Sequence, residues 1–175
     1  MRTIVLFAAG GDLPMSSAVQ FIDSDLFGPL TKKALDSPRL RTNYNFHSGD
    51  EDNPHRFLNV MARGTFVPPH RHLDPPKSET ILILEGRVGL FIFDDEGKVT
   101  LAQVVGGPSR LGVDIPAGVW HTLVVTTPFV VAFEMKAGPF LASRGKDLPA
   151  WAPQEGDPEA AGYLEQLLAH LPLVT

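Results

Sequence analysis

Residues 64–86 constrain this chain more than any other segment, because they hold two histidines and a carboxylate between apolar runs. His70 and His72 lie two residues apart, directly after Pro68 and Pro69, which favour an extended backbone. Residues two apart on an extended chain project from the same face, about 6.6 Å apart along the backbone. Two imidazoles with this spacing can bind one cation through bonds of roughly 2.0–2.2 Å.

Two further residues complete a candidate metal site. Glu79 begins the next apolar run and supplies an anionic oxygen, and His121 follows a turn that contains Pro116 and Gly118. Three imidazoles and a carboxylate would be costly to bury in an apolar fold without a cation to satisfy them. The sequence therefore predicts a metal site whose ligands are His70, His72, Glu79 and His121.

The types of these ligands limit the identity of the ion. Nitrogen and oxygen donors without sulfur suit divalent Fe, Mn, Ni, Co, Cu or Zn. The chain has no cysteine, which excludes thiolate ligands and disulfides. Four protein ligands on an octahedral ion would leave two positions for water, dioxygen or a bidentate substrate. The expected cofactor is a divalent transition metal, with the choice among these six open.

Short apolar segments bounded by turn residues dominate the middle of the sequence. Sixteen Gly and sixteen Pro among 175 residues favour many short strands joined by tight turns. At least eight strand patterns follow one another without an intervening helical pattern, which predicts an all-β sandwich or barrel. The expected strands are 39–46, 56–65, 79–84, 87–93, 98–105, 111–115, 120–126 and 129–136.

Two helical patterns flank these strands. Apolar positions within 26–35 fit one helical face, with an Asp or Ser cap in 23–25. Residues 158–171 carry leucines at helical spacing, with Asp157 as the expected cap and Pro158 in the first turn. The second helix is expected to cover the barrel or a partner subunit.

These patterns divide the chain into three parts. Residues 16–140 are expected to form the barrel with its N-terminal helix, and residues 141–175 a C-terminal extension with the covering helix. Residues 1–15 form an extension that is either an added strand or the result of a misassigned start, with Met15 as the true first residue. The apolar run 3–10 is too short to span a bilayer and lacks a cleavage pattern, which favours a cytoplasmic protein.

The residues of the candidate metal site also match a known motif. That motif places a glycine, a His-x-His pair, a glutamate and a second glycine at fixed intervals. The residues that fill it here are Gly64, His70, His72, Glu79 and Gly86. The segment therefore resembles the first cupin motif. Its one departure is the gap of six residues between His72 and Glu79, where three or four are usual.

The second cupin motif is matched in part. Pro116, Gly118 and His121 agree with it, whereas Arg110 and Val125 stand where the motif has a glycine and an asparagine. Neither departure changes a ligand type. Together the two motifs imply a single-domain cupin jelly-roll β-barrel that binds a metal ion.

Further stretches resemble one subgroup, the WbuC-type cupin-fold metalloproteins associated with some bacterial surface-polysaccharide gene clusters. These stretches cover most of residues 16–155 and are 37–41, 45–47, 55–59, 69–72, 120–122, 133–139 and 151–153. The resemblance implies the fold and the metal. It supplies no reaction, because the subgroup is named for those two properties.

Three polar residues outside the ligand set are candidates for a pocket. Glu134 and Lys136 lie two apart on the last expected strand and share a face, which points either to solvent or into the pocket. The resemblance includes this Glu-x-Lys and favours the pocket, where the two would act as catalytic acid and base. Arg56 would bind a carboxylate or phosphate of a ligand, or else form a surface salt bridge.

Other residues near the motifs are assigned to structure. Arg71 is expected to point away from the His-x-His face, and Trp120 to pack in the core on the side opposite His121. His47 and His55 flank an acidic loop and are expected to be isolated surface histidines.

A metal with open positions beside an acid and a base suits a small anionic or polyol ligand. The first hypothesis is a sugar or polyol isomerase or epimerase linked to surface-polysaccharide metabolism. The alternatives are an Fe(II)-dependent dioxygenase and a non-catalytic module that binds metal or a small ligand. A net charge of −5 argues against nucleic acid or an anionic membrane as partner, and a homodimer is expected.

Overall fold

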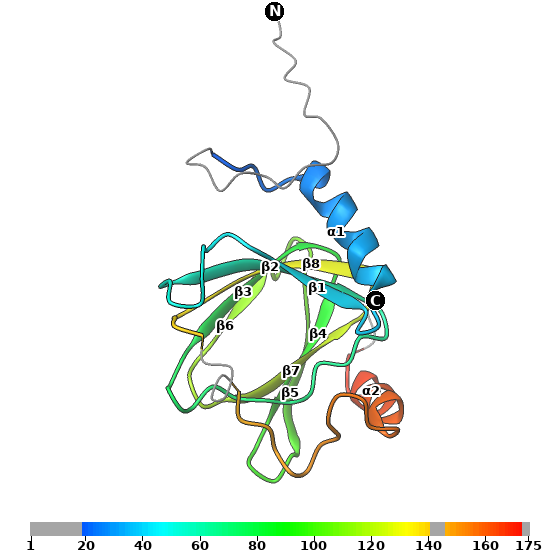
Figure 1. The fold of residues 1–175 in the computed structure, drawn as a ribbon. Coiled ribbons are helices and arrows are strands. Elements are labelled where there is room, and N and C mark those ends of the chain that lie inside the picture. The colour runs from blue at the N-terminus through cyan, green and yellow to red at the C-terminus, as the bar shows by residue number, and fades with distance from the viewer. Residues whose placement is uncertain (1–18, 141–145, 173–175) are drawn as a thin grey trace, which may run out of the picture.

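Eight β-strands lie between two α-helices, as the sequence patterns predict (Figure 1). The structure is a computed structural model and describes residues 19–140 and 146–172. The elements are α1 (Ser24–Asp36), β1 (Arg41–Asn45), β2 (His55–Ala62), β3 (Glu79–Glu85), β4 (Val88–Phe93), β5 (Val99–Val105), β6 (Gly112–Ile115), β7 (Trp120–Val125), β8 (Phe129–Lys136) and α2 (Ala160–Leu168). The predictions for residues 1–15, including a start at Met15, fall outside the described residues.

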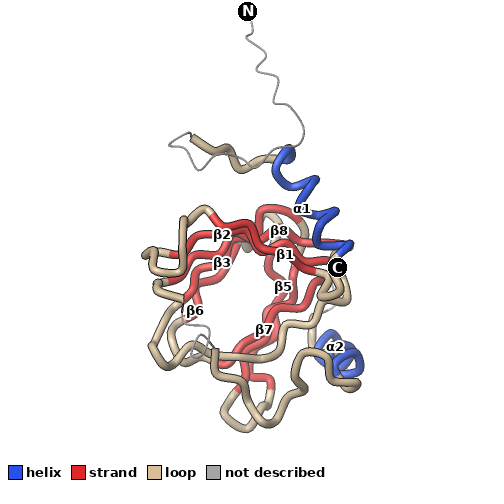
Figure 2. Tube along the Cα trace, viewed as in Figure 1, coloured by secondary structure: helices blue, strands red, loops and turns tan. Residues whose placement is uncertain are grey.

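The strands form two antiparallel sheets that face each other across the interior (Figure 2). The larger sheet has the order β1-β2-β8-β3-β6, and the smaller one has the order β5-β4-β7. Within the described chain the two sheets are not joined into one closed barrel, so the fold is a jelly roll with an open side. The segment after β2 runs beside β7 but pairs with it only at His70 and His121, because Pro68 and Pro69 have no N–H to donate.

Helix α1 covers the outer face of the larger sheet. Its predicted cap is confirmed, because the Asp23 carboxylate accepts hydrogen bonds from two backbone N–H groups of the first turn. Leu30 and Ala34 of the helix are buried in one cluster with Leu58 and Val131 of the sheet. The apolar side chains on the outer face of β8 are therefore buried under α1. Its inward-facing positions can then hold polar residues.

Helix α2 covers the outer face of the smaller sheet. Leu164 and Leu167 pack in a cluster with aromatic side chains of β4 and β7. The predicted cap of this helix is wrong: the helix starts after Glu159, and Asp157 instead accepts from the Gln154 N–H at 2.7 Å, which closes the preceding turn. None of the helices in the described part of the chain is long and apolar enough to cross a membrane.

The turn between β3 and β4 requires a glycine. Gly86 has φ +81°, and a Cβ there would collide with the Phe129 carbonyl oxygen. We expect Gly86→Ala to lower the free energy of unfolding by at least about 1–3 kcal/mol, measured by urea denaturation. Gly28→Ala in α1 is the matched control: its Cβ would meet no atom within 4 Å, so stability should rise by about 0.5–1 kcal/mol. Equal stability of Gly86→Ala and wild type would contradict the prediction.

Candidate metal centre

The backbone joins the two histidine segments of the candidate site. The His70 N–H donates to the His121 carbonyl oxygen at 3.0 Å, and the His121 N–H donates back to the His70 carbonyl oxygen at 2.9 Å. The Gly118 N–H adds a bond to the His72 carbonyl oxygen at 3.1 Å. Gly118 has φ +80°, which explains why this turn contains a glycine. The three imidazoles are therefore brought together by main-chain hydrogen bonds.

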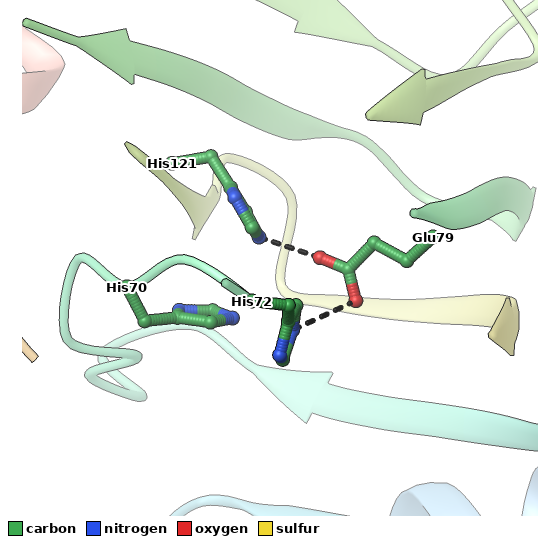
Figure 3. Close-up of side chains that lie close together, drawn as sticks. All are labelled: His70, His72, Glu79 and His121. Atoms are coloured by element: carbon green, nitrogen blue, oxygen red, sulfur yellow. Dashed lines mark ion pairs between the residues drawn. The ribbon is translucent and has the colours of Figure 1, made fainter. Parts of the chain in front are cut away.

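Glu79 reaches the cluster from the first residue of β3 (Figure 3). Its Oε1 atom lies 2.5 Å from His121 Nε2, and its Oε2 atom lies 3.4 Å from His72 Nε2. The long gap before Glu79 is taken up by a turn in which Leu73 and Pro76 form a β-bridge. The extra residues of this gap therefore do not move the carboxylate away from the histidines.

All four predicted ligands converge. One ligand atom from each of His70, His72, Glu79 and His121 lies within 4.8 Å of the others, and each residue is at most 5% exposed. Nitrogen and carboxylate oxygen form a donor set that suits a divalent transition metal. This set is common to Fe, Mn, Ni, Co, Cu and Zn, so the identity of the ion is a matter for metal analysis.

Hydrogen bonds behind two of the imidazoles select the tautomer that a metal requires. His70 Nδ1 lies 3.0 Å from the Pro68 carbonyl oxygen, and His121 Nδ1 lies 2.8 Å from the Val119 carbonyl oxygen. A carbonyl oxygen only accepts, so each Nδ1 carries a proton, and Nε2 is the ring atom left to face the cluster and bind a metal. Metal-binding histidines are typically oriented in this way.

The charge states of the cluster also fit metal ligation. Burial lowers the pKa of His70 well below its usual value, and the nearby charges of Lys146 and His121 lower it further. Burial alone would raise the pKa of Glu79, but its contacts with His121 and His72 and the charge of Lys136 hold it well below its usual value. Both groups are therefore in the deprotonated form that binds a cation.

His70, Glu79 and His121 of the cluster lie in the wall of a cavity of about 900 Å³ between the sheets. Strands β1, β2, β3, β7 and β8 contribute inward-facing side chains to it. Much of the lining is polar, and the amides of Asn43, Asn45 and Asn59 lie on β1 and β2. A polar cavity of this volume suits a small, hydrogen-bonding ligand rather than an apolar one.

Glu134 and Lys136 line this cavity rather than facing solvent. Lys136 Nζ lies 2.9 Å from Glu134 Oε1 and 3.6 Å from Glu79 Oε2. Burial would lower the pKa of Lys136, but the carboxylates of Glu134 and Glu79 raise it above its ordinary value. The Asn59 side-chain N–H₂ donates to Glu134 Oε2 at 3.3 Å. An ordered carboxylate and an ammonium group therefore lie next to the metal cluster.

Two expectations about neighbouring residues are not met. Arg56 lies on the exposed outer side of β2 and does not line the cavity, because strand alternation turns it away from the side that carries Phe57; its Nη2 donates to the Phe46 carbonyl oxygen at 3.3 Å. His55 is buried instead of isolated at the surface. It stacks on His47 with ring centroids 4.1 Å apart, and both rings line the cavity.

Arg71 and Trp120 have the structural roles expected of them. The Arg71 guanidinium lies 4.3 Å from the centroid of the Trp120 ring. It also pairs with Asp95 at 3.4 Å and with Asp147 at 3.5 Å. The Asp147 contact, together with two backbone hydrogen bonds between Arg71 and Asp147, fixes the start of the C-terminal segment to the histidine loop.

This C-terminal segment supplies cavity residues that no sequence pattern indicates. Glu155 pairs with Arg39 at 2.8 Å and with Arg41 at 2.7 Å, and all three line the cavity. Lys146 also lines it; although part of this residue reaches solvent, burial and the charge of Lys136 lower its pKa to about 8. The segment 146–155 is therefore part of the cavity wall.

The sheet order and the layered core define a jelly-roll fold, the architecture that the resemblance to the cupin motifs predicts. Similar folds occur in protein SO0799 from Shewanella oneidensis, with TM-score 0.56, 11% identity, and coverage of 84% of this chain and 98% of that one. The capsular polysaccharide assembling protein CapF from Staphylococcus aureus gives TM-score 0.54 and 18% identity, covering 65% of this chain and 32% of its own. This chain thus spans about a third of CapF, and both likenesses show the fold alone.

Sequence comparison is less informative. A family model described as "Domain of unknown function (DUF6016)" matches residues 22–105. The matched range includes His70, His72 and Glu79 but ends before His121. No curated protein matches the chain.

We expect His70→Ala and His121→Ala each to weaken metal binding by at least about 100-fold. Each removes a direct ligand, and even the loss of a residue that only hydrogen-bonds to a ligand weakens binding by about 10- to 100-fold. Metal content after dialysis, measured by inductively coupled plasma mass spectrometry, checks this. His47→Ala is the control, since His47 lines the cavity but lies outside the cluster. Stoichiometric metal in both variants would overturn the assignment of the ligands.

We also expect the metal-free protein to lose stability on acidification. The pKa values of His70 and Glu79 are lowered on folding from 6.5 and 4.5, so the unfolded chain binds more protons in acid. Their contributions are fully present above pH 6.5 and 4.5, and are lost as the pH falls through the folded values. Thermal unfolding midpoints measured in EDTA between pH 7 and pH 4 follow the loss of stability. In His70→Gln, the decrease of the midpoint that begins near pH 6.5 should be smaller than in wild type. A midpoint independent of pH would refute the prediction.

Proposed function

We propose that this protein is a metal-binding cupin whose cavity takes a small ligand, and that it isomerises or epimerises a sugar or polyol. The position of Glu134 and Lys136 carries this proposal. Both line the cavity that His70, Glu79 and His121 also line, and Lys136 Nζ lies within 4 Å of carboxylates from Glu134 and Glu79. A module that only binds metal needs no proton-transfer residues beside the ligands, whereas an isomerase does.

His70, His72, Glu79 and His121 would hold a divalent ion, which would polarise the carbonyl oxygen of a sugar in its open-chain form. Side chains of the protein would carry out the proton transfer. Glu134 would take a proton from the carbon adjacent to the carbonyl carbon, and would return a proton to that carbon in an epimerisation or to the former carbonyl carbon in an isomerisation. Its carboxylate is held in place by Lys136 on one oxygen and by Asn59 on the other. Lys136, an ammonium at neutral pH because its pKa is raised, would balance the negative charge that forms on the ligand.

The proposed sugar chemistry has support from two resemblances. The sequence resembles the WbuC-type cupins of surface-polysaccharide gene clusters, and the fold is similar to that of CapF, described as a capsular polysaccharide assembling protein. Proteins that share a fold often catalyse different reactions. These resemblances therefore support only the class of ligand, and the pair Glu134 and Lys136 supports the proposed proton transfer. We further propose that the protein is a cytoplasmic homodimer. Light scattering coupled to size-exclusion chromatography tests the oligomeric state.

We expect the metal-loaded protein to exchange a carbon-bound hydrogen of its sugar substrate with solvent. A panel of neutral aldoses and ketoses incubated in D₂O, followed by mass spectrometry, detects the incorporated deuterium. Glu134→Gln should slow this exchange by about 100-fold or more while leaving the metal content unchanged. Arg56→Ala is the control, because Arg56 lies outside the cavity.

The same samples separate the other functions. Oxygen uptake by the iron-loaded protein with any member of the panel would favour an Fe(II)-dependent dioxygenase. Tight sugar binding with neither deuterium exchange nor oxygen uptake would favour a non-catalytic binding module. Exchange that is equally fast in Glu134→Gln would show that Glu134 is not the base.

A further inference from the structure

One buried polar atom of the cavity wall has no donor among the described residues. Asn59 Oδ1 is shielded from solvent and accepts no hydrogen bond from that part of the chain. Asn59 lies in the middle of β2 on the inward side, and it lines the cavity. Buried amide oxygens in folded proteins nearly always have a partner, so Asn59 Oδ1 is an acceptor that a hydroxyl of a bound ligand can satisfy.

The orientation of the Asn59 amide is fixed by its neighbour. Its N–H₂ group donates to Glu134 Oε2 at 3.3 Å. If the amide were turned over, two oxygens would face each other, which is unfavourable. Glu134 is also held from its other side, by Lys136 at 2.9 Å. Asn59 and Glu134 therefore form a rigid pair that presents hydrogen-bond acceptors.

The cationic side chains of the lining are mostly committed to carboxylates. Arg39 and Arg41 share Glu155, at 2.8 and 2.7 Å, and Lys136 lies near Glu134 and Glu79. Within the described lining, only Lys146 has no carboxylate at ion-pair distance. A single ammonium binds phosphate or carboxylate less well than a forked guanidinium does. Apart from a metal ion at the cluster, the cationic side chains of the cavity thus offer little to an anionic ligand.

We propose that Asn59 and Glu134 form a hydroxyl-binding subsite that selects an uncharged polyhydroxylated ligand over a phosphorylated or carboxylated one. One ligand hydroxyl donates to Asn59 Oδ1 and another to the Glu134 carboxylate. Asn43 lies directly opposite Asn59 on β1, and its amide can donate to and accept from further hydroxyls. This inference rests on the proposed function, because it assumes that the cavity beside the metal cluster binds the ligand.

Binding of defined probes to the metal-loaded protein tests the subsite. The probes are xylitol, D-mannose, D-glucuronate and mannose phosphate, each measured by isothermal titration calorimetry. We expect a neutral probe to bind best, and Asn59→Leu to weaken that binding by about tenfold, the loss of one hydrogen bond to a buried group. Arg56→Leu is the matched control on the same strand, facing outward. A preference for a charged probe, no binding of either neutral probe, or equal affinity in Asn59→Leu would each overturn the proposal.

Stability separates a binding role of Asn59 from a structural one. Without ligand, Asn59→Leu removes an unsatisfied acceptor but also the N–H₂ group that donates to Glu134 Oε2. These two effects oppose each other, so the thermal midpoint should stay within a few degrees of that of wild type. A clearly lower midpoint would show that Asn59 supports the fold, and would also overturn the proposal.

Metal content of the same samples distinguishes this inference from the proposed function. If the wild type holds no metal but binds a neutral probe through Asn59, the proposed function fails and the subsite stands. If metal is held and deuterium exchange occurs while Asn59→Leu binds as wild type does, only the subsite fails.

Discussion

The reciprocal main-chain hydrogen bonds between His70 and His121 are the constraint on which the rest of the site depends. They join the loop after β2 to the start of β7, two segments fifty residues apart in sequence. Pro68 and Pro69 confine this pairing to one bridge, so the sheets stay open on that side. The same short contact therefore gathers the imidazoles and leaves room for a cavity next to them.

The two helices explain how a small β-fold can have a polar interior. Each covers the outer face of one sheet, so apolar side chains of β8 and β7 pack outward as well as inward. Burial of that outer surface stabilises the fold. The inward-facing sides of β3 and β8 can then carry charged groups, which neutralise one another through the contacts of Lys136 with Glu79 and Glu134.

Local signals in the sequence predict most of the fold and the core of the site. Alternating strands, turn glycines such as Gly86 and the Asp23 cap act over a few residues, and the motif spacing identifies all four residues of the cluster. The features that were missed depend on tertiary packing. The open side of the jelly roll, the burial of His55 and the place of Lys146 in the cavity lining arise from segments that meet only in the folded chain. The two alternatives for Arg56 stayed open because nothing local marks which side of β2 faces the cavity.

The C-terminal segment is tied down at two points, at Arg71 through Asp147 and at Arg39 and Arg41 through Glu155. Between these tethers it contributes wall to the cavity, although it is remote in sequence from every histidine of the cluster. Ligand preference can therefore diverge through changes in this tail while the metal-binding residues stay the same. Surface ion pairs that look purely structural would then act as determinants of what the cavity accepts.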